Sequence, residues 1–182
     1  MKDFVREDLR FSLCGLNCGL CPMQLDGHCP GCGGGAGNQS CKIARCSLEH
    51  GSPAYCFACG EFPCGRYEGI DEYDSFITHR RRLADLETAR TEGLEAYRAG
   101  QAERRERLEF LLDNCNDGRR KTLFYLAANL LPLPDLRRIC REAEGMLEVP
   151  LKERGARVAA LLQEAAERAD VTLKLRKKPK KA

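Results

Sequence analysis

Cysteines dominate the chemistry that this chain of 182 residues can perform, because it contains 12 of them and ten lie close together near the N-terminus. Three pairs, beginning at Cys18, Cys29 and Cys56, have a gap of two residues, and the pair that begins at Cys41 has a gap of four. Two thiolates at such a spacing can be directed by one turn of the chain at a single tetrahedral ion. Four pairs would supply two such sites. The predicted metal ligands are Cys14, Cys18, Cys21, Cys29, Cys32, Cys41, Cys46, Cys56, Cys59 and Cys64.

Zinc is the metal that this pattern favours, at about two ions per chain, because zinc needs four soft ligands and no redox chemistry. The alternative is a [4Fe–4S] cluster, since Cys14, Cys18 and Cys21 have a spacing that can hold such a cluster with one iron open. The predicted function is therefore a structural zinc module that serves as an interaction or scaffold unit. The alternative function is redox or metal handling through an Fe–S cluster or a labile metal.

The spacing leaves open which cysteines share an ion. Sequential pairing would place the four paired cysteines between Cys18 and Cys32 at one ion and the four between Cys41 and Cys59 at the other. A crossed arrangement is equally compatible with the spacing, and either flanking residue, Cys14 or Cys64, could replace a member of a pair. His28 and His50 remain open as additional ligands.

The expected compartment is the cytoplasm. The first residues, MKDFVREDLR, contain no apolar segment of the kind that begins a secretory signal. The longest apolar run, residues 123–133, is far shorter than the ~20 residues of a membrane span. Disulfides do not persist in a reducing cytosol, so a dense cysteine array is expected to bind metal instead.

The fold class expected is mostly α. Residues 1–69 are rich in cysteine and glycine and show little periodicity, apart from a short helix expected over residues 41–50. Such a segment cannot offset its own chain entropy by hydrophobic burial, so metal coordination would have to contribute. We expect this small, metal-nucleated module, with little regular structure, to pack on a bundle of about four to five helices formed by residues 70–173.

The helical prediction depends on apolar residues that recur at intervals of three and four. An apolar face begins at Tyr73 and predicts a helix over residues 72–90, and further stripes run through residues 94–115, 123–130, 136–147 and 151–169. Pro134 and Pro150 are positioned to begin helices. Cys115 and Cys140 lie on apolar stripes and are predicted to be buried core thiols. Residues 171–175 alternate in polarity, which is compatible with a short strand or an extended arm.

The formal net charge of +3 comes from the C-terminal end of the chain. Residues 174–182 carry six basic side chains and no acidic one, and this basic tail is expected to be disordered. A protein partner is expected, nucleic acid is a weaker candidate through the tail, and a membrane is not expected. No catalytic constellation is recognisable, so enzymatic activity stays open.

Several cysteine contexts together resemble the Domain of Unknown Function 3795 family. The resemblance rests on Cys14-Gly15-Leu16-Asn17-Cys18-Gly19-Leu20-Cys21, on Cys29-Pro30-Gly31-Cys32, on Cys41 to Cys46 and on Cys56 to Cys64, which ends in Phe62-Pro63-Cys64. It covers residues 11–70 closely. The family consists of cysteine-rich bacterial and archaeal proteins that are taken to bind zinc, and it has no established activity. The resemblance therefore implies the ten clustered cysteines as metal ligands and leaves the role of the protein uncharacterised.

Overall fold

Helices are the regular secondary structure of the part of the chain that the structure describes. The computed structural model describes residues 3–35 and 41–179, and in these residues it contains seven α-helices, three short 3-10 helices and no strand. The mostly α fold class is thus confirmed. The chain forms two compact units: the first holds residues 1–99 and 176–182, and the second holds residues 100–175. Residues 1, 2 and 36–40 of the predicted module and residues 180–182 of the predicted tail lie outside the description.

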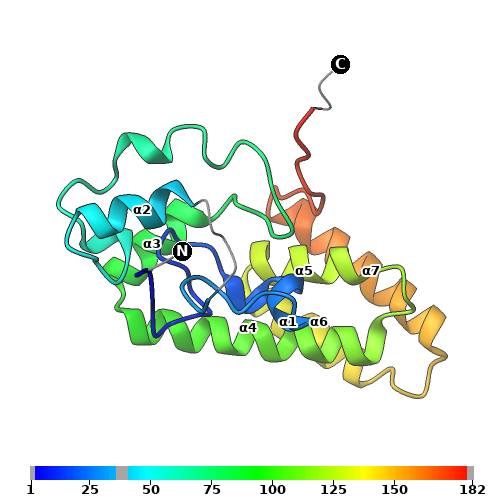
Figure 1. Ribbon diagram of the computed structural model, residues 1–182. Helices are drawn as coiled ribbons and strands as arrows, with labels where there is room; N and C mark the ends of the chain where they lie inside the picture. The colour runs from blue at the N-terminus through cyan, green and yellow to red at the C-terminus, as the bar shows by residue number, and fades with distance from the viewer. Residues whose placement is uncertain (1–2, 36–40, 180–182) are drawn as a thin grey trace. The chain divides into compact units, whose positions relative to one another are not determined.

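The first unit contains little regular structure, as expected for its sequence (Figure 1). Its α-helices are α1 (Pro22–Leu25), α2 (Lys42–Glu49), α3 (Arg82–Thr91) and the start of α4 (Leu94–Cys115). The 3-10 helices are η1 (Cys18–Leu20), η2 (Cys56–Ala58) and η3 (Gly65–Tyr67). The short helix predicted over residues 41–50 is confirmed by α2.

The helix predicted over residues 72–90 is wrong in its first half, because α3 begins only at Arg82. The preceding segment is held in a loop by Asp74, whose Oδ1 accepts a hydrogen bond from the backbone N–H of His79 at 2.8 Å. Side chains of this kind compete with helical hydrogen bonds for the backbone. Phe76, expected on the apolar face, is 66% exposed as a result.

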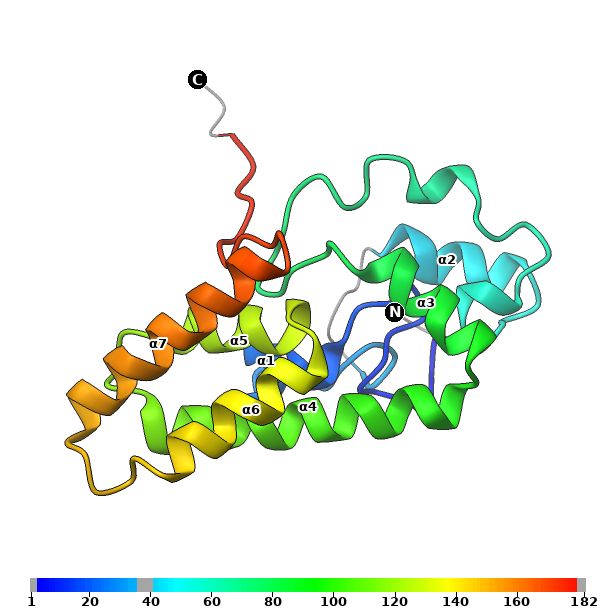
Figure 2. The same cartoon turned by 180° about the vertical axis from the view of Figure 1, so that it is seen from behind.

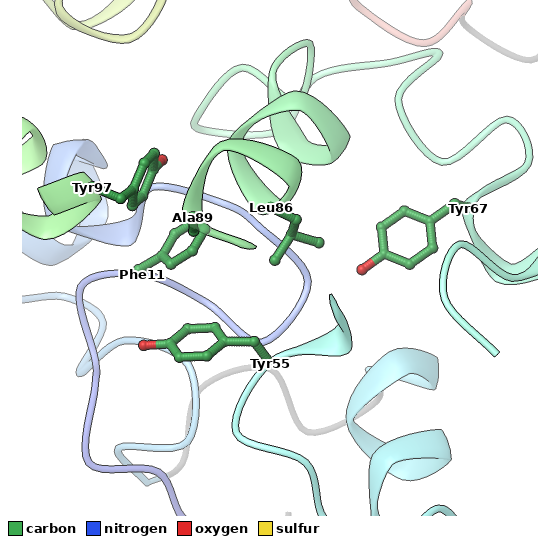
Figure 3. Packing of buried hydrophobic residues seen from close by; sticks show 6 residues of the cluster. All are labelled: Phe11, Tyr55, Tyr67, Leu86, Ala89 and Tyr97. Atoms are coloured by element: carbon green, nitrogen blue, oxygen red, sulfur yellow. The ribbon is translucent and has the colours of Figure 1, made fainter. Parts of the chain in front are cut away.

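An aromatic core joins the cysteine-rich segment to α3 and to the start of α4 (Figure 3). The ring of Phe11 lies 4.6 Å from that of Tyr97 and 5.3 Å from that of Tyr55, measured between centroids. Leu86 of α3 separates this group from Tyr67 in the same view. The first unit therefore buries more apolar surface than its sequence alone indicates, because α3 and α4 supply the other half of the core.

The second unit is a helical bundle made of the rest of α4 together with α5 (Lys121–Leu130), α6 (Leu133–Glu144) and α7 (Leu151–Arg168) (Figure 2). Helices α5, α6 and α7 each contact the other two. Arg104 of α4 donates hydrogen bonds to the carbonyls of Ala128 at 2.9 Å and Leu131 at 2.7 Å at the end of α5. The expected helical bundle is confirmed, and so is the burial of Cys115 and Cys140, which are both 0% exposed.

Helices α6 and α7 begin at prolines, as predicted. Pro134 lies in the first turn of α6, and Pro150 immediately precedes α7. Leu147 does not lie on α6 as predicted, because the helix ends at Glu144 and Leu147 is 46% exposed. The buried side chain of Arg154 in α7 instead donates hydrogen bonds to carbonyls of the connecting loop, among them Leu147 and Val149.

The chain after α7 returns to the first unit. The backbone N–H of Asp74 donates to the carbonyl of Arg176 at 2.8 Å, and the N–H of Arg176 donates to Asp74 Oδ2 at 2.9 Å. The Arg176 guanidinium also contacts the carbonyl of Asp71. One residue of the predicted basic tail is therefore anchored. Among the residues described, no helix has the length and apolar character needed to cross a membrane.

Candidate metal centre

The fold brings eight of the ten predicted cysteine ligands to two pockets, with four thiols at each. We call the first the large pocket; it measures about 700 Å³, and its cysteines are Cys14, Cys18, Cys32 and Cys41. We call the second the small pocket; it measures about 30 Å³, and its cysteines are Cys46, Cys56, Cys59 and Cys64. Both pockets lie within the first unit.

A tight turn places Cys14 and Cys18 at the large pocket. The Ser12 hydroxyl accepts a hydrogen bond from the N–H of Leu16 at 2.7 Å and lies 3.3 Å from the Cys14 sulfur. Gly15 has a φ of +91°, and a Cβ at this position would lie 2.2 Å from the carbonyl oxygen of Arg82. Only glycine fits this close approach between the turn and α3.

A glycine-containing loop places Cys32 at the same pocket. Gly31 has a φ of +95°, and a Cβ there would lie 2.3 Å from the carbonyl oxygen of Leu9. Gln24 secures the same point, since its amide donates to the Leu9 carbonyl at 2.6 Å. The loop therefore folds closely against the N-terminal segment and directs Cys32 toward Cys14 and Cys18.

The thiols of the large pocket are close enough to affect one another's protonation. Burial raises the pKa of Cys18 strongly, and the neighbouring Cys32, Cys14 and Cys21 raise it further. Burial also raises the pKa of Cys32, which has Cys14 and Cys41 as neighbours. Without a cation, the raised pKa values keep Cys18 and Cys32 protonated at pH 7, whereas a bound metal ion would favour their thiolate forms and offset part of the thiolate charge.

The small pocket has a more apolar wall. Burial raises the pKa of Cys56 to about 12, and Cys14, Cys64 and Cys46 add to the increase, while the nearby Tyr67 hydroxyl opposes it. Tyr67 is buried, and its hydroxyl has no hydrogen-bond partner of good geometry in the described structure. Cys14 of the large pocket lies close to Cys56 of the small pocket, so the two pockets adjoin.

His50 lines the small pocket but is oriented by other groups. Its Nδ1 lies 2.8 Å from the Cys46 carbonyl oxygen and 3.6 Å from the Cys46 sulfur, and its Nε2 lies 3.4 Å from Glu61. The contact with the carbonyl raises the pKa of His50, as does the charge of Glu61. His50 is therefore placed as a neighbour of Cys46, whereas His28 is exposed and lines neither pocket.

Cys21 and Cys29 line neither of the two pockets. Cys21 directly precedes α1, and its pKa is raised by burial, with Cys29 as a further contributor. The two therefore neighbour each other, and Cys21 also neighbours Cys18. Cys21 thus lies near its sequence partner Cys18 without lining the same pocket, whereas Cys14 and Cys64 line pockets with the paired cysteines, which differs from sequential pairing.

All twelve cysteines are free thiols in the structure, and four of them converge at each pocket. Within residues 3–35 and 41–179, no three cysteine, histidine or acidic side chains stand at the mutual spacing of bound metal ligands. Metal binding would therefore require the thiols of a pocket to move closer to one another. As a donor set, four thiols match the preference of zinc and of Fe–S clusters.

Three basic residues of the large pocket, Lys42, Arg66 and Arg82, were not identified from the sequence. Arg82 is only 5% exposed, although it ends a run of four basic residues, His79 to Arg82, that is typical of a solvated surface. No local signal distinguishes the buried member of such a run. The carbonyl that approaches Gly15 shows why Arg82 is covered.

Comparison of the chain with protein-family models, with curated proteins and with solved structures gave no match. The function therefore has to be argued from the residues of the two pockets.

Proposed function

We propose that the chain is a zinc protein whose two metal centres organise the first unit. The large pocket would hold one ion through Cys14, Cys18, Cys32 and Cys41, and the small pocket would hold the other through Cys46, Cys56, Cys59 and Cys64. The observation that carries this proposal is the division of eight thiols into two sets of four, drawn from segments that are distant in sequence. Neither set follows from sequence spacing alone.

A structural role for these ions accords with the rest of the first unit. Most of its residues lie outside helices, so few backbone groups are held by regular hydrogen bonding. Metal coordination in such a module contributes directly to the free energy of folding. We propose a scaffold or interaction unit of the cytoplasm, in keeping with the resemblance to the Domain of Unknown Function 3795 family, with a protein as its partner.

The test is the metal content of protein purified anaerobically without added metal, measured by mass spectrometry together with the visible spectrum. We expect about two zinc ions per chain and no colour. Cys18→Ser and Cys56→Ser should each lose about one ion, since each removes one ligand of one four-thiol set. Cys115→Ser is the matched control and should retain both ions, because Cys115 is buried in the second unit. A chain that carries no metal would refute the proposal.

An Fe–S centre is the second candidate, and one observation favours it. Cys14 and Cys21 both neighbour Cys18, so the three thiols with cluster-type spacing are also close in space. The same metal measurement separates the candidates. Iron with matching acid-labile sulfide and a visible absorption band would replace the zinc proposal with a redox or metal-handling function.

A further inference from the structure

The two pockets differ greatly in size, which a pair of equivalent metal centres does not explain. The small pocket measures about 30 Å³, as suits a site filled by its own side chains and one ion. The large pocket measures about 700 Å³. Pockets of roughly 300–1,000 Å³ are those in which proteins hold small molecules. The large pocket therefore has room for a ligand beside its thiols.

A buried arginine at this pocket has one nitrogen, Nε, that makes an ion pair but, within the described residues, no hydrogen bond of good geometry. Arg82 lines the pocket, is only 5% exposed, and pairs with Asp71, whose Oδ1 lies 3.2 Å from the Arg82 Nε. Neither of these two atoms makes a hydrogen bond in the described structure. Nearly all buried polar groups in folded proteins are hydrogen-bonded, and a buried charge without hydrogen bonds is costly. The Arg82 Nε therefore has an ion-pair partner in Asp71 but no hydrogen bond of good geometry in the part of the chain described.

The charges around the pocket indicate the sign of that partner. Lys42 and Arg66 line the pocket together with Arg82, and Glu68 is the acidic residue among the lining side chains. Lys42 and Arg66 are exposed, and the Arg66 side chain also hydrogen-bonds to Cys46 of the small pocket. The planar fork of a guanidinium matches the two oxygens of a carboxylate or phosphate group, whereas a thiolate sulfur does not offer that paired geometry.

We infer that the large pocket binds a small oxyanion, a molecule with a carboxylate or phosphate group, which Arg82 holds beside the metal centre. Lys42 and Arg66 would contribute charge from the rim of the pocket. This inference deepens the proposed function and rests on it, because metal binding by the thiols organises the pocket. The large pocket would then be the site at which the protein recognises its ligand, and the small pocket would be purely structural.

The experiment is calorimetric titration of the full, zinc-loaded chain with inorganic phosphate and, separately, with malonate, in a chloride buffer free of other oxyanions. We expect at least one probe to bind, and the stronger of the two identifies the class of oxyanion. Arg82→Gln should weaken binding about tenfold or more, as loss of hydrogen bonds to a charged group does. Arg82→Lys should keep part of the affinity. Arg90→Gln, on the exposed side of the same helix, is the matched control and should bind as the original chain does.

Metal content is measured on the same samples, so that the two proposals fail separately. Two zinc ions without binding of either probe would overturn the inference and leave the proposed function intact. Unchanged anion binding in Arg82→Gln, with or without loss of metal, would also overturn the inference. Arg82 would then interact with the thiols or with Asp71 and not with a ligand. Anion binding that depends on Arg82 in a chain without metal would refute only the metal assignment. Should Arg82→Gln fail to fold, Lys42→Gln at the exposed rim decides, since unchanged affinity there would overturn the inference.

Discussion

At the scale of single residues, a buried polar network ties the turn of Cys14 and Cys18 to the helices of the first unit. Asn17 donates a hydrogen bond from Nδ2 to Asp85 Oδ2 at 2.8 Å, and its Oδ1 accepts one from the Tyr97 hydroxyl at 2.8 Å. All three residues are less than 9% exposed. Since Cys18 follows Asn17 directly, this network fixes the position of a predicted metal ligand.

Tyr97→Phe tests this network. The substitution removes the hydroxyl and leaves the buried Oδ1 of Asn17 without that donor, so we expect the free energy of unfolding to fall by about 1–2 kcal/mol. Chemical denaturation of the metal-loaded chain measures the change. Tyr73→Phe is the matched control, because the Tyr73 hydroxyl contacts Glu72 at the surface, and its effect should stay within about 0.5 kcal/mol. Equal effects of the two substitutions would contradict the assigned role of Asn17.

Asp8 makes stability depend on pH. Partial burial would raise the pKa of Asp8, but hydrogen bonds from Tyr55, from the N–H groups of Phe11 and Arg10 and from Arg98 outweigh it and lower the pKa below 3.8. A carboxyl group with a depressed pKa stabilises the fold above its unfolded value of about 4, and that contribution is lost as pH falls through the folded pKa.

We therefore expect the original chain to be more stable than Asp8→Asn at pH 6 to 7, and this advantage to shrink as pH falls below about 4. Urea denaturation of both chains across this range measures the difference in the free energy of unfolding. Both chains contain the same cysteines, so the effect of thiol protonation on stability cancels in this difference. Asp113→Asn, at an exposed position of α4, is the control and should show a small difference at every pH. A stability difference for Asp8→Asn that does not vary with pH would show that the carboxylate is unimportant.

At the scale of residues, the sequence indicated which side chains would gather better than it indicated which of them would share a pocket. The spacing of the cysteines predicted that thiols would gather, and the structure brings eight of them to two pockets. The grouping stayed open because it depends on contacts between distant segments, such as the approach of Gly15 to Arg82. Arg82 and Asn17 could not be found for the same reason, since their burial is created by the tertiary fold.

At the scale of helices, the close packing of α7 on the end of α4 depends on a glycine. A Cβ at Gly155 would lie 2.5 Å from the carbonyl oxygen of Cys115, closer than real contacts allow. Arg154, the preceding residue, donates a hydrogen bond to the carbonyl of Asn114 at 2.7 Å and so fastens the same contact. The two residues together bring one helix directly against the backbone of another.

Gly155→Ala should therefore destabilise the second unit by about 1–3 kcal/mol, because overpacking outweighs the higher helix propensity of alanine. Gly100→Ala in α4 is the matched control, since a Cβ there meets nothing within 4 Å. This control should stabilise the chain by up to about 1 kcal/mol. Thermal and urea unfolding measure both, and effects of the same sign would contradict the close contact.

The helices of the second unit could be predicted because each buries an apolar stripe that recurs at helical spacing. Leu108, Leu111 and Cys115 of α4 are all 0% exposed, as their spacing predicts. The helix predicted to begin at residue 72 shows that apolar periodicity alone does not determine where a helix begins, because α3 begins at Arg82. Tyr73, Phe76 and Ile77 have helical spacing, but Asp74 bonds to the backbone of His79 and to Arg176, and the latter contact spans 102 residues. Local pattern carries no information about such a distant partner.

At the scale of the whole molecule, the two units are expected to respond differently to loss of metal. The eight thiols of the two pockets belong to the first unit, whereas the second unit buries a helical core of its own. A strong chelator should therefore unfold residues 1–70 and leave α5, α6 and α7 folded.

Hydrogen–deuterium exchange with mass spectrometry measures this response for each segment. We expect backbone amides of residues 1–70 to lose protection after chelation and to regain it when zinc is returned, while α5 to α7 serve as the internal control. Full protection of residues 1–70 in metal-free protein would show that the aromatic core around Phe11 and Tyr97 is sufficient to hold the first unit.

The anchoring of Arg176 has a consequence for the order in which the protein is made. The Asp74 side chain is 0% exposed in the finished structure, and Arg176 is a principal partner of its carboxylate. During synthesis on the ribosome, residues 1–99 emerge long before Arg176 exists. Until then the Asp74 carboxylate has its local partners, Thr78 and His79, but lacks the hydrogen bond to the Arg176 backbone. The first unit is thus completed by residues that follow the second unit in the chain, so a variant cut before Arg176 would leave this carboxylate without its Arg176 partner.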